Sequence, residues 1–281
     1  MYRTMAKARA LMLASLLATL PVAAFAADAV VPTAGVDSRI DAIKRRGTLR
    51  VAVIDEYPWL KKNPDANGPP FIGPAWLLAE EYAKRLGVKI ETTPVVFDNK
   101  VSVVTSGQVD ITVVPLLQTP EREKIVDMIL YSKAAHCLFG LATNPKVALA
   151  QTFDDLNRVD VTIAFIADTP QGRWLQNRLP LAKPRGVLGN IADIATDEVV
   201  SGRADVAPID QFFFTGLANK TPGLASVPHG PACLDSQELT ITLGMAINKN
   251  QPAFLAWLRG VATEIKPQVD AEMLKLVRMG S

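Results

Sequence analysis

The sequence predicts an α/β protein built from two similar lobes, and three observations lead to this prediction. Strand-like and helix-like segments alternate along the chain, a pattern typical of helices packed around mostly parallel sheets. No low-complexity linker interrupts the alternation. A short motif occurs twice, as SGQVDITVVP from Ser106 and as SGRADVAPID from Ser201, each time where a helix should end and a strand begin. The repeat favours two related lobes over one large sheet.

The first 26 residues have the features of a secretory signal peptide. Three basic residues precede the apolar run LMLASLLATL, and Ala24-Phe25-Ala26 offers small residues for cleavage. The apolar run is too short to span a membrane as a helix. We therefore expect cleavage after Ala26 and an exported, periplasmic protein. The alternative is an uncleaved N-terminal anchor.

The chain beyond this leader is nearly neutral. The leader contains three of the 30 Lys and Arg residues and none of the 28 Asp and Glu residues, so the remainder has a net charge of −1. No basic patch interleaved with aromatic residues remains, and binding to nucleic acid is therefore not expected. The roughly 255 remaining residues can bury one large core or two smaller ones.

The expected elements of the first half are defined by hydrophobic spacing and by turn residues. Apolar residues at helical spacing predict a helix from Pro74 that ends at Gly87, a natural C-cap. Pro94 should shorten the strand that contains it. In order, the sequence predicts a buried strand over 49–54, a helix over 74–86, a strand over 89–97, a short helix over 99–107 and a strand over 109–116.

The second half repeats this rhythm. The sequence predicts strands over 161–167, 185–189, 204–209 and 239–247, helices over 169–179 and 191–202, and a long helix from Pro252. The segments 136–143 and 234–243 are expected to cross between the lobes.

Residues suited to ligand binding follow the predicted strands, at the carboxyl ends where open α/β sheets bind ligands. Thr119-Pro120 and Thr169-Pro170 each place a capping hydroxyl before a proline at the first helical position. Free N–H groups at helix starts bind anions, an arginine adds a bidentate carboxylate partner, and a carboxylate suits an ammonium group. The full set is Asp55, Glu56, Tyr57, Trp59, Phe97, Thr119, Arg122, Asp168, Thr169 and Asp210.

Arg122 stands out because it lies in the first turn of an expected helix, where the helix dipole disfavours a cation. An anionic ligand held between the arginine and the helix start would explain its position. The alternative is a solvated arginine balanced by neighbouring glutamates. Asp210 and Thr169 are likewise either ligand contacts or helix caps. The rings of Tyr57 and Phe97 either line a ligand site or pack as ordinary aromatic residues.

The order of the segments GTLRVAVIDEYPW, FDNKVSVVTSGQVDI, TPEREK, FDDL and GRADVAPID resembles the periplasmic amino-acid-binding proteins of ABC importers, solute-binding family 3. The resemblance covers nearly the whole chain after the leader. It implies a two-lobed type II periplasmic-binding-protein fold with two crossing strands as the hinge. The corresponding division is 36–136 plus 238–281 for the first lobe and 137–237 for the second.

The resemblance also implies roles for individual residues. Arg122 would clamp a carboxylate of the ligand beside Thr119, and Thr169 would add a donor from the other lobe. Asp210 would take an ammonium group, while Tyr57 and Phe97 would enclose the side chain of the ligand.

Two departures from the family pattern bear on the ligand. Leu117 stands where members of the family have Ser or Thr, and Asp168 would repel a carboxylate if it faced the ligand. A standard α-amino acid therefore does not follow from the resemblance alone.

We therefore expect a monomeric, non-enzymatic protein that captures a small polar solute, an amino acid or related organic acid, by hinge closure. It would deliver the solute to an inner-membrane ABC permease. No cofactor and no metal are expected, since His136 and His229 are the only histidines and neither has metal-ligand spacing. The alternative is a periplasmic dehydratase of the prephenate or arogenate type on the same fold, with Glu56, Asp168 or Asp210 transferring protons.

The only two cysteines, Cys137 and Cys233, admit two interpretations. In an exported chain they can form a disulfide, and the alternative is a pair of buried thiols. Each lies near an expected crossing between the lobes, so a disulfide there would limit hinge motion.

Overall fold

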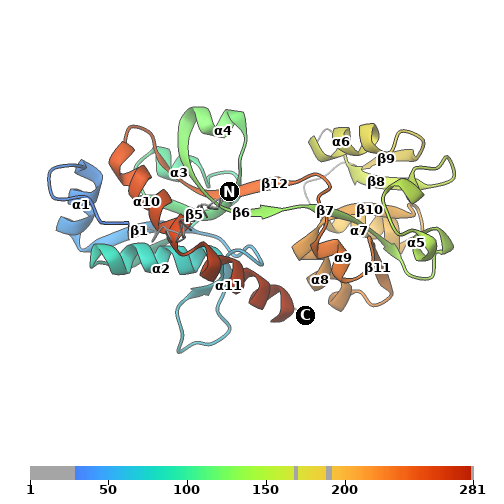
Figure 1. Cartoon of the computed structure of the whole chain (residues 1–281), viewed down its shortest axis with the longest axis horizontal. Helices are drawn as coiled ribbons and strands as arrows, with labels where there is room; N and C mark the ends of the chain where they lie inside the picture. The colour runs from blue at the N-terminus through green and yellow to red at the C-terminus, as the bar shows by residue number, and fades with distance from the viewer. Residues whose placement is uncertain (1–28, 168–169, 188–191, 280–281) are drawn as a thin grey trace, which may run out of the picture.

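The computed structural model describes residues 29–167, 170–187 and 192–279, which form two lobes lying side by side (Figure 1). The first lobe contains a five-stranded sheet of order β4-β1-β5-β12-β6, and the second contains a five-stranded sheet of order β11-β7-β10-β8-β9. In each sheet three neighbouring strands are parallel and the others are antiparallel. The predicted two-lobed α/β fold is therefore confirmed.

The first lobe is assembled from both ends of the chain. Its strands are β1 (Thr48–Val53), β4 (Lys89–Pro94), β5 (Ile111–Leu117), β6 (Val126–Ala134) and β12 (Ile241–Asn248), with a separate hairpin of β2 (Lys61–Lys62) and β3 (Phe71–Ile72). Its helices are α1 (Ser38–Arg46), α2 (Pro74–Leu86), α3 (Ser102–Thr105), α4 (Pro120–Ile125), α10 (Pro252–Glu264) and α11 (Lys266–Met279).

The second lobe is formed by the middle of the chain. Its strands are β7 (His136–Leu141), β8 (Thr162–Ile166), β9 (Lys183–Val187), β10 (Val206–Asp210) and β11 (Leu224–Val227). Its helices are α5 (Pro145–Leu149), the 3-10 helix η1 (Asp154–Leu156), α6 (Pro170–Arg178), α7 (Ala192–Val200), α8 (Gln211–Lys220) and α9 (Pro231–Leu234).

Most predicted elements form within a few residues of their expected bounds, but the long helix expected from Pro252 is two helices. α10 ends at Glu264 and α11 begins at Lys266, so Pro267 lies in the first turn of α11. Proline is tolerated there because the N–H it lacks has no partner in a first helical turn. No helix among the described residues has the length and apolar character needed to cross a bilayer.

The chain crosses between the lobes at two places, and one differs from the prediction. β6 ends at Ala134, and β7 begins at His136 already within the second sheet, opposite Asp210. The segment 136–143 is therefore not a crossing, and the expectation was wrong. The first crossing is the single residue Ala135, while the return crossing from α9 to β12 falls within the expected segment.

The aspartate of the repeated motif makes the same pair of hydrogen bonds in both lobes. Asp110 precedes β5 and accepts a hydrogen bond of 2.9 Å from the backbone N–H of Arg50, while its own N–H donates to the Arg50 carbonyl. Asp205 precedes β10 and makes the equivalent pair of bonds with Thr162, at 2.8 Å each. Each aspartate thus fixes the register between the starts of two parallel strands.

Each lobe buries its own apolar core, and an aromatic contact joins the two. Phe212 of α8 packs into the core of the first lobe, with its ring 6.2 Å from that of Trp59. The neighbouring Phe213 lies edge-on to Trp59 at 5.6 Å and to Tyr57 at 6.4 Å. The start of α8 is therefore held against the first lobe.

Gly73 positions the polypeptide that contains Trp59. It precedes α2 with φ of 116°, and a Cβ at this position would lie 2.6 Å from the Trp59 carbonyl oxygen. Only glycine combines this backbone conformation with such a close approach. The same carbonyl accepts the N–H of Ala75, so α2 begins directly against the loop that follows β1.

Cys137 and Cys233 are joined by a disulfide, and both are buried in the core of the second lobe. Cys137 lies in β7, just after the chain enters this lobe, and Cys233 lies in α9, just before it leaves. The bond therefore ties together the two ends of one lobe. It does not link the two lobes, which removes the expectation that it limits hinge motion.

We predict that the double substitution C137A/C233A destabilises the second lobe. The bond closes a loop with a sequence separation of 96 residues, which corresponds to about 4–5 kcal/mol of unfolding free energy in the chain-entropy model. Urea-induced unfolding of the oxidised protein and of the double variant measures the difference. Equal unfolding midpoints would show that the loop constraint contributes nothing.

Candidate functional site

The carboxyl ends of the parallel strands in both lobes lie beside the crossing segments. Leu117, the last residue of β5, pairs with Leu243, two residues after β12 begins. Asp210, the last residue of β10, pairs with His136, the first residue of β7. Since both partners lie next to a crossing, the carboxyl end of each parallel set is directed toward the other lobe. Side chains that follow β1, β4 and β5 can therefore meet the same ligand as those that follow β10.

Arg122 is half-buried in the first turn of α4, close to the end of β5. Its Nη1 donates a hydrogen bond of 2.6 Å to the Leu117 carbonyl oxygen, and its backbone N–H donates to Thr119 Oγ1 at 3.3 Å. Thr119 is therefore the N-cap of α4, in agreement with the predicted helix start. α4 has only six residues, so its dipole is small, and an anion bound here would be held by the guanidinium rather than by the helix start. The main-chain carbonyl of Leu117 orients this guanidinium.

Glu56 and Lys100 form a partly buried charge pair beside Arg122. Lys100 Nζ lies 4.0 Å from Glu56 Oε2, and the two side chains are 11% and 17% exposed. Burial raises the pKa of the Glu56 carboxyl, and the charges of Lys100 and Arg122 partly offset this rise. Burial likewise lowers the pKa of Lys100, an effect that Glu56 opposes. Among the described residues, Glu56 Oε2 has no hydrogen-bond partner.

Lys100 also contacts the aromatic residue predicted to line the site. Its Nζ lies 4.7 Å from the centroid of the Phe97 ring, within the range of a cation–π interaction, and Phe97 is 62% exposed. The sequence analysis missed Lys100. Its only sequence signal is a basic residue at the start of the helix predicted over 99–107, just after a predicted strand.

Asp210 caps α8 and is almost completely buried. Its Oδ1 accepts a hydrogen bond of 2.8 Å from the Phe212 N–H, so the capping role proposed for it is present. Burial raises the pKa of Asp210 to about 7, although hydrogen bonds from the N–H groups of Phe212 and Phe213 oppose the rise. Oδ2 is buried and has no hydrogen-bond partner among the described residues. One carboxylate oxygen is thus occupied by the cap, and the other is buried without a hydrogen-bond partner among the described residues.

Of the three remaining residues predicted to bind the ligand, the structure describes Tyr57 but not Asp168 or Thr169. Tyr57 is half-buried, and its hydroxyl donates to the Leu276 carbonyl oxygen of α11 at 3.1 Å, so its ring bridges helices of the two lobes. Asp168 and Thr169 lie outside the described residues. A ligand-binding role for these three residues stays a prediction.

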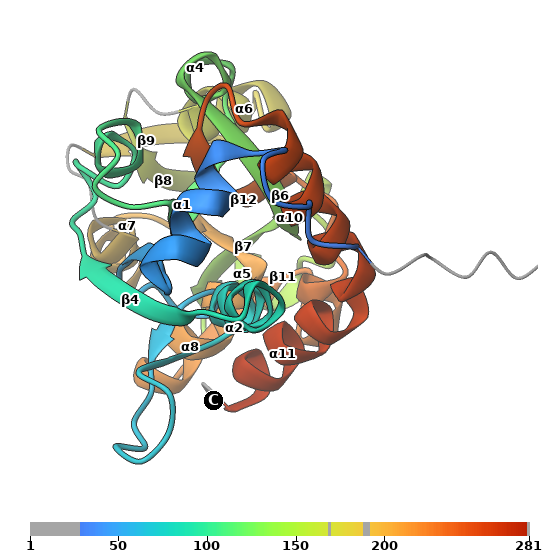
Figure 2. The ribbon, with the colours of Figure 1, turned by 90° about the vertical axis from the view of Figure 1, so that its left-hand side faces the viewer.

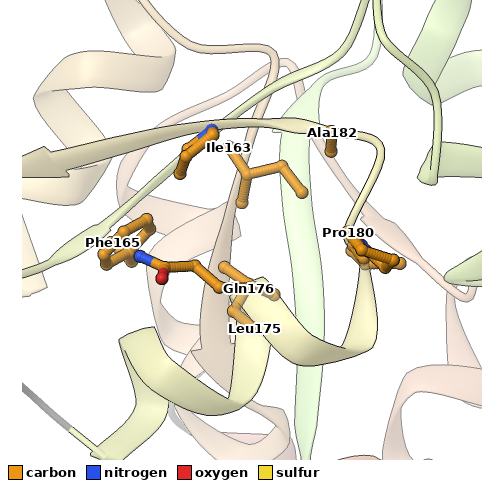
Figure 3. Close-up of a pocket in the computed structure, with 8 residues that line it drawn as sticks. Ile163, Phe165, Leu175, Gln176, Pro180 and Ala182 are labelled. Carbon is orange, nitrogen blue, oxygen red and sulfur yellow. The ribbon is translucent and has the colours of Figure 1, made fainter.

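Two hollows in the molecule lie apart from these residues. A small cavity of about 130 Å³ lies under α6 and is lined mainly by apolar side chains of β8 and α6, among them Ile163, Phe165 and Leu175 (Figure 3). A larger groove of about 720 Å³ is lined by β6, β12, α8, α9 and α11. Figures 1 and 2 place α11 and α8 on the side of the crossing strands opposite α4. Neither hollow is lined by a residue predicted to bind the ligand.

The fold and the charged residues at the facing sheet ends define a two-lobed binding protein, and sequence comparison gives its family. The chain belongs to the bacterial extracellular solute-binding proteins, family 3, whose model matches residues 49–275.

The chain is similar to several known proteins. The probable ABC transporter extracellular-binding protein YckB of Bacillus subtilis (strain 168) is 27% identical over 199 residues, which span 69% of this chain and 66% of that protein. The structure of an ancestral cationic amino acid solute binding protein matches with a TM-score of 0.64 and 32% identity, over 86% of this chain and 99% of its own. An ancestral cyclohexadienyl dehydratase matches with a TM-score of 0.55 and 27% identity, over 85% and 96%.

We predict that Asp210 makes stability depend on pH between about 4 and 7. Its pKa is higher in the folded protein, so the folded state binds more protons than the unfolded state in this range. The unfolding free energy therefore falls as the pH rises, by up to about 4 kcal/mol in total. D210N retains an oxygen for capping but does not titrate. Denaturant unfolding at a series of pH values should give a steeper decline for the native chain than for D210N, and parallel profiles would contradict the elevated pKa.

Proposed function

We propose that this protein is the periplasmic substrate-binding component of an ABC importer. It captures a small polar solute, an amino acid or a related organic acid, between its lobes and delivers the solute to an inner-membrane permease. The observation that carries the proposal is the placement of a guanidinium, Arg122, and a buried carboxylate, Asp210, at sheet ends directed toward one another from different lobes. Family membership and the transport description of YckB support the same assignment.

The two charges suit the two ends of a small polar solute. A carboxylate of the solute binds the Arg122 guanidinium, which the Leu117 carbonyl holds in position. A donor group of the solute, such as an ammonium, binds Asp210 Oδ2, which lacks a hydrogen-bond partner among the described residues. An unpaired buried carboxylate oxygen is unfavourable, so a donor from the solute relieves a cost already present.

Such a solute favours closure because it contacts both lobes. A ligand shifts a conformational equilibrium only through contacts that differ between the two states. Contacts to Arg122 alone are the same whether the lobes are apart or together, whereas simultaneous contact with Asp210 requires the lobes to approach. The two crossing segments between the lobes, Ala135 and the residues between α9 and β12, are where a hinge closure would take place.

A second candidate function is that of a periplasmic dehydratase of the prephenate or arogenate type. Two observations favour it: the similarity to an ancestral cyclohexadienyl dehydratase, and the pKa of about 7 for Asp210, which suits a general acid or base at neutral pH. Incubation with prephenate or arogenate, followed spectroscopically, tests it. Turnover that D210N abolishes would favour the enzyme, and absence of turnover would remove this candidate.

We predict that a thermal-shift screen of the exported form against amino acids and small carboxylic acids identifies a ligand. A compound that binds only the folded protein raises the unfolding midpoint, and the shift grows with its concentration above the dissociation constant. A concentration-dependent shift with one class of compound supports capture of a solute. No shift with any compound of the panel would contradict the amino-acid or organic-acid assignment.

We also predict that R122A weakens binding of the ligand found in this screen by at least about tenfold, the scale expected for loss of hydrogen bonds to a charged group. Isothermal titration calorimetry measures the affinity, and circular dichroism verifies that the variant is folded. K124A is the matched control because Lys124 is exposed on the same short helix, and this variant should retain its affinity. Unchanged binding by folded R122A would exclude Arg122 from the site.

A further inference from the structure

The aromatic rings expected to enclose the ligand are already covered by lysines of the protein itself. Lys100 Nζ lies 4.7 Å from the centroid of Phe97, and Lys61 Nζ lies 5.6 Å from the centroid of Tyr57. Aromatic faces attract cations, and a ligand cation would compete with these ammonium groups for the same faces. The arrangement therefore disfavours a ligand with a positively charged side chain.

The carboxylate that would complete a cation site is also engaged. Glu56 follows β1 at the same sheet edge as Phe97, and Lys100 Nζ lies 4.0 Å from its Oε2. Lys100 thus has the two partners, an aromatic face and a carboxylate, that would otherwise bind the cationic end of a basic amino acid. A lysine of the chain takes the place that such a ligand group would occupy.

The charge of the cluster points to the opposite kind of ligand. Lys100 and Arg122 contribute two positive charges against the single carboxylate of Glu56, and each cation lowers the pKa of that carboxyl. The two cations also act on one another, since the charge of Arg122 lowers the pKa of Lys100. A second acid group on the ligand would relieve this repulsion.

We infer that Lys100 selects a solute with two acid groups, of the α-amino dicarboxylate class. The ammonium group of Lys100 lies between the Phe97 ring and the Glu56 carboxylate, where the cationic group of a basic ligand would otherwise bind. The inference rests on the proposed function and narrows its substrate class. One carboxylate of the solute binds Arg122 and the second binds Lys100. The ammonium group of the solute binds Asp210 Oδ2, which has no hydrogen-bond partner among the described residues.

This inference separates the chain from one of its structural relatives. The ancestral protein that is 32% identical is described as a cationic amino acid solute binding protein. In this chain, a ligand of that class would have to displace Lys100 from both Phe97 and Glu56. On this inference, the two proteins select ligands of opposite charge, and in this chain the selection depends on Lys100 in the loop between β4 and α3.

The test uses ligand pairs that differ in charge and hardly at all in shape. Isothermal titration calorimetry compares glutamate with glutamine, aspartate with asparagine, and both acids with arginine and lysine. We expect the native chain to bind at least one acid at least about tenfold more tightly than its amide, as expected for one charged hydrogen bond. K100M should abolish this preference and should bind arginine or lysine more tightly than the native chain does.

K62M is the matched control, because Lys62 is an exposed lysine of the hairpin near Tyr57 and should leave both preferences unchanged. A native chain that binds arginine or lysine more tightly than the acids overturns the inference and leaves the proposed function standing. Preference for the acids that K100M does not alter also overturns it. Absence of binding to every compound, in the native chain and in K100M, overturns the inference together with an amino-acid ligand.

Discussion

The antiparallel ladder between β6 and β12 is the interaction on which the relation of the two lobes depends. It runs from Ile241 opposite Ala134 to Asn248 opposite Val126, with one register shift between Leu243 and Gly244 at which Tyr131 is skipped, and one of its ends lies where both strands leave the first lobe. Because one strand leads into the second lobe and the other returns from it, the ladder fixes where both crossings begin. It also sets which edge of the first sheet faces the second lobe, since β12 pairs on its other side with β5. The residues after β5, including Arg122, are consequently brought to the boundary between the lobes.

The parallel part of each sheet depends on a second constraint, which is the buried aspartate at its start. Asp110 exchanges backbone and side-chain hydrogen bonds with Arg50, and its carboxylate also receives Arg39 and Arg46. Asp205 does the same with Thr162 and receives Lys146. Fixing the amino ends of neighbouring parallel strands in register also sets where their carboxyl ends stop, and those ends carry the candidate site. The repeated sequence motif is therefore explained by the same aspartate hydrogen bonds at the start of the parallel strands in both lobes.

Local signals explain why part of this architecture was predictable and part was not. The helix at Pro74, its glycine cap, the threonine cap before Arg122 and the aspartate motifs all depend on residues close in sequence, and all could be read from it. The crossing at Ala135 could not, because only this one residue separates β6 from β7 and the point of division depends on which sheet each strand joins. Lys100 was missed for a related reason: its partners are Glu56, 44 positions earlier, and a ring whose exposure only the fold determines. The division of the last helical segment has a local signal in Pro267, which favours a position in the first turn of a new helix.

Without a ligand, the buried carboxylates of Asp210 and Glu56 lower the stability of the folded protein. Serine or asparagine would cap α8 as effectively as Asp210 does, and neither would bury an ionisable group whose second oxygen lacks a partner. Glu56 has the same feature in the first lobe, where Lys100 approaches its Oε2 without making a hydrogen bond. Buried ionisable groups with incomplete partners gather at functional sites because a ligand supplies what the fold omits. Among the described residues, each lobe has one such carboxylate oxygen, Glu56 Oε2 in the first and Asp210 Oδ2 in the second. In the proposed function, a solute whose donor group pairs with Asp210 while its acid group binds the first lobe would couple the binding free energy to the position of the lobes.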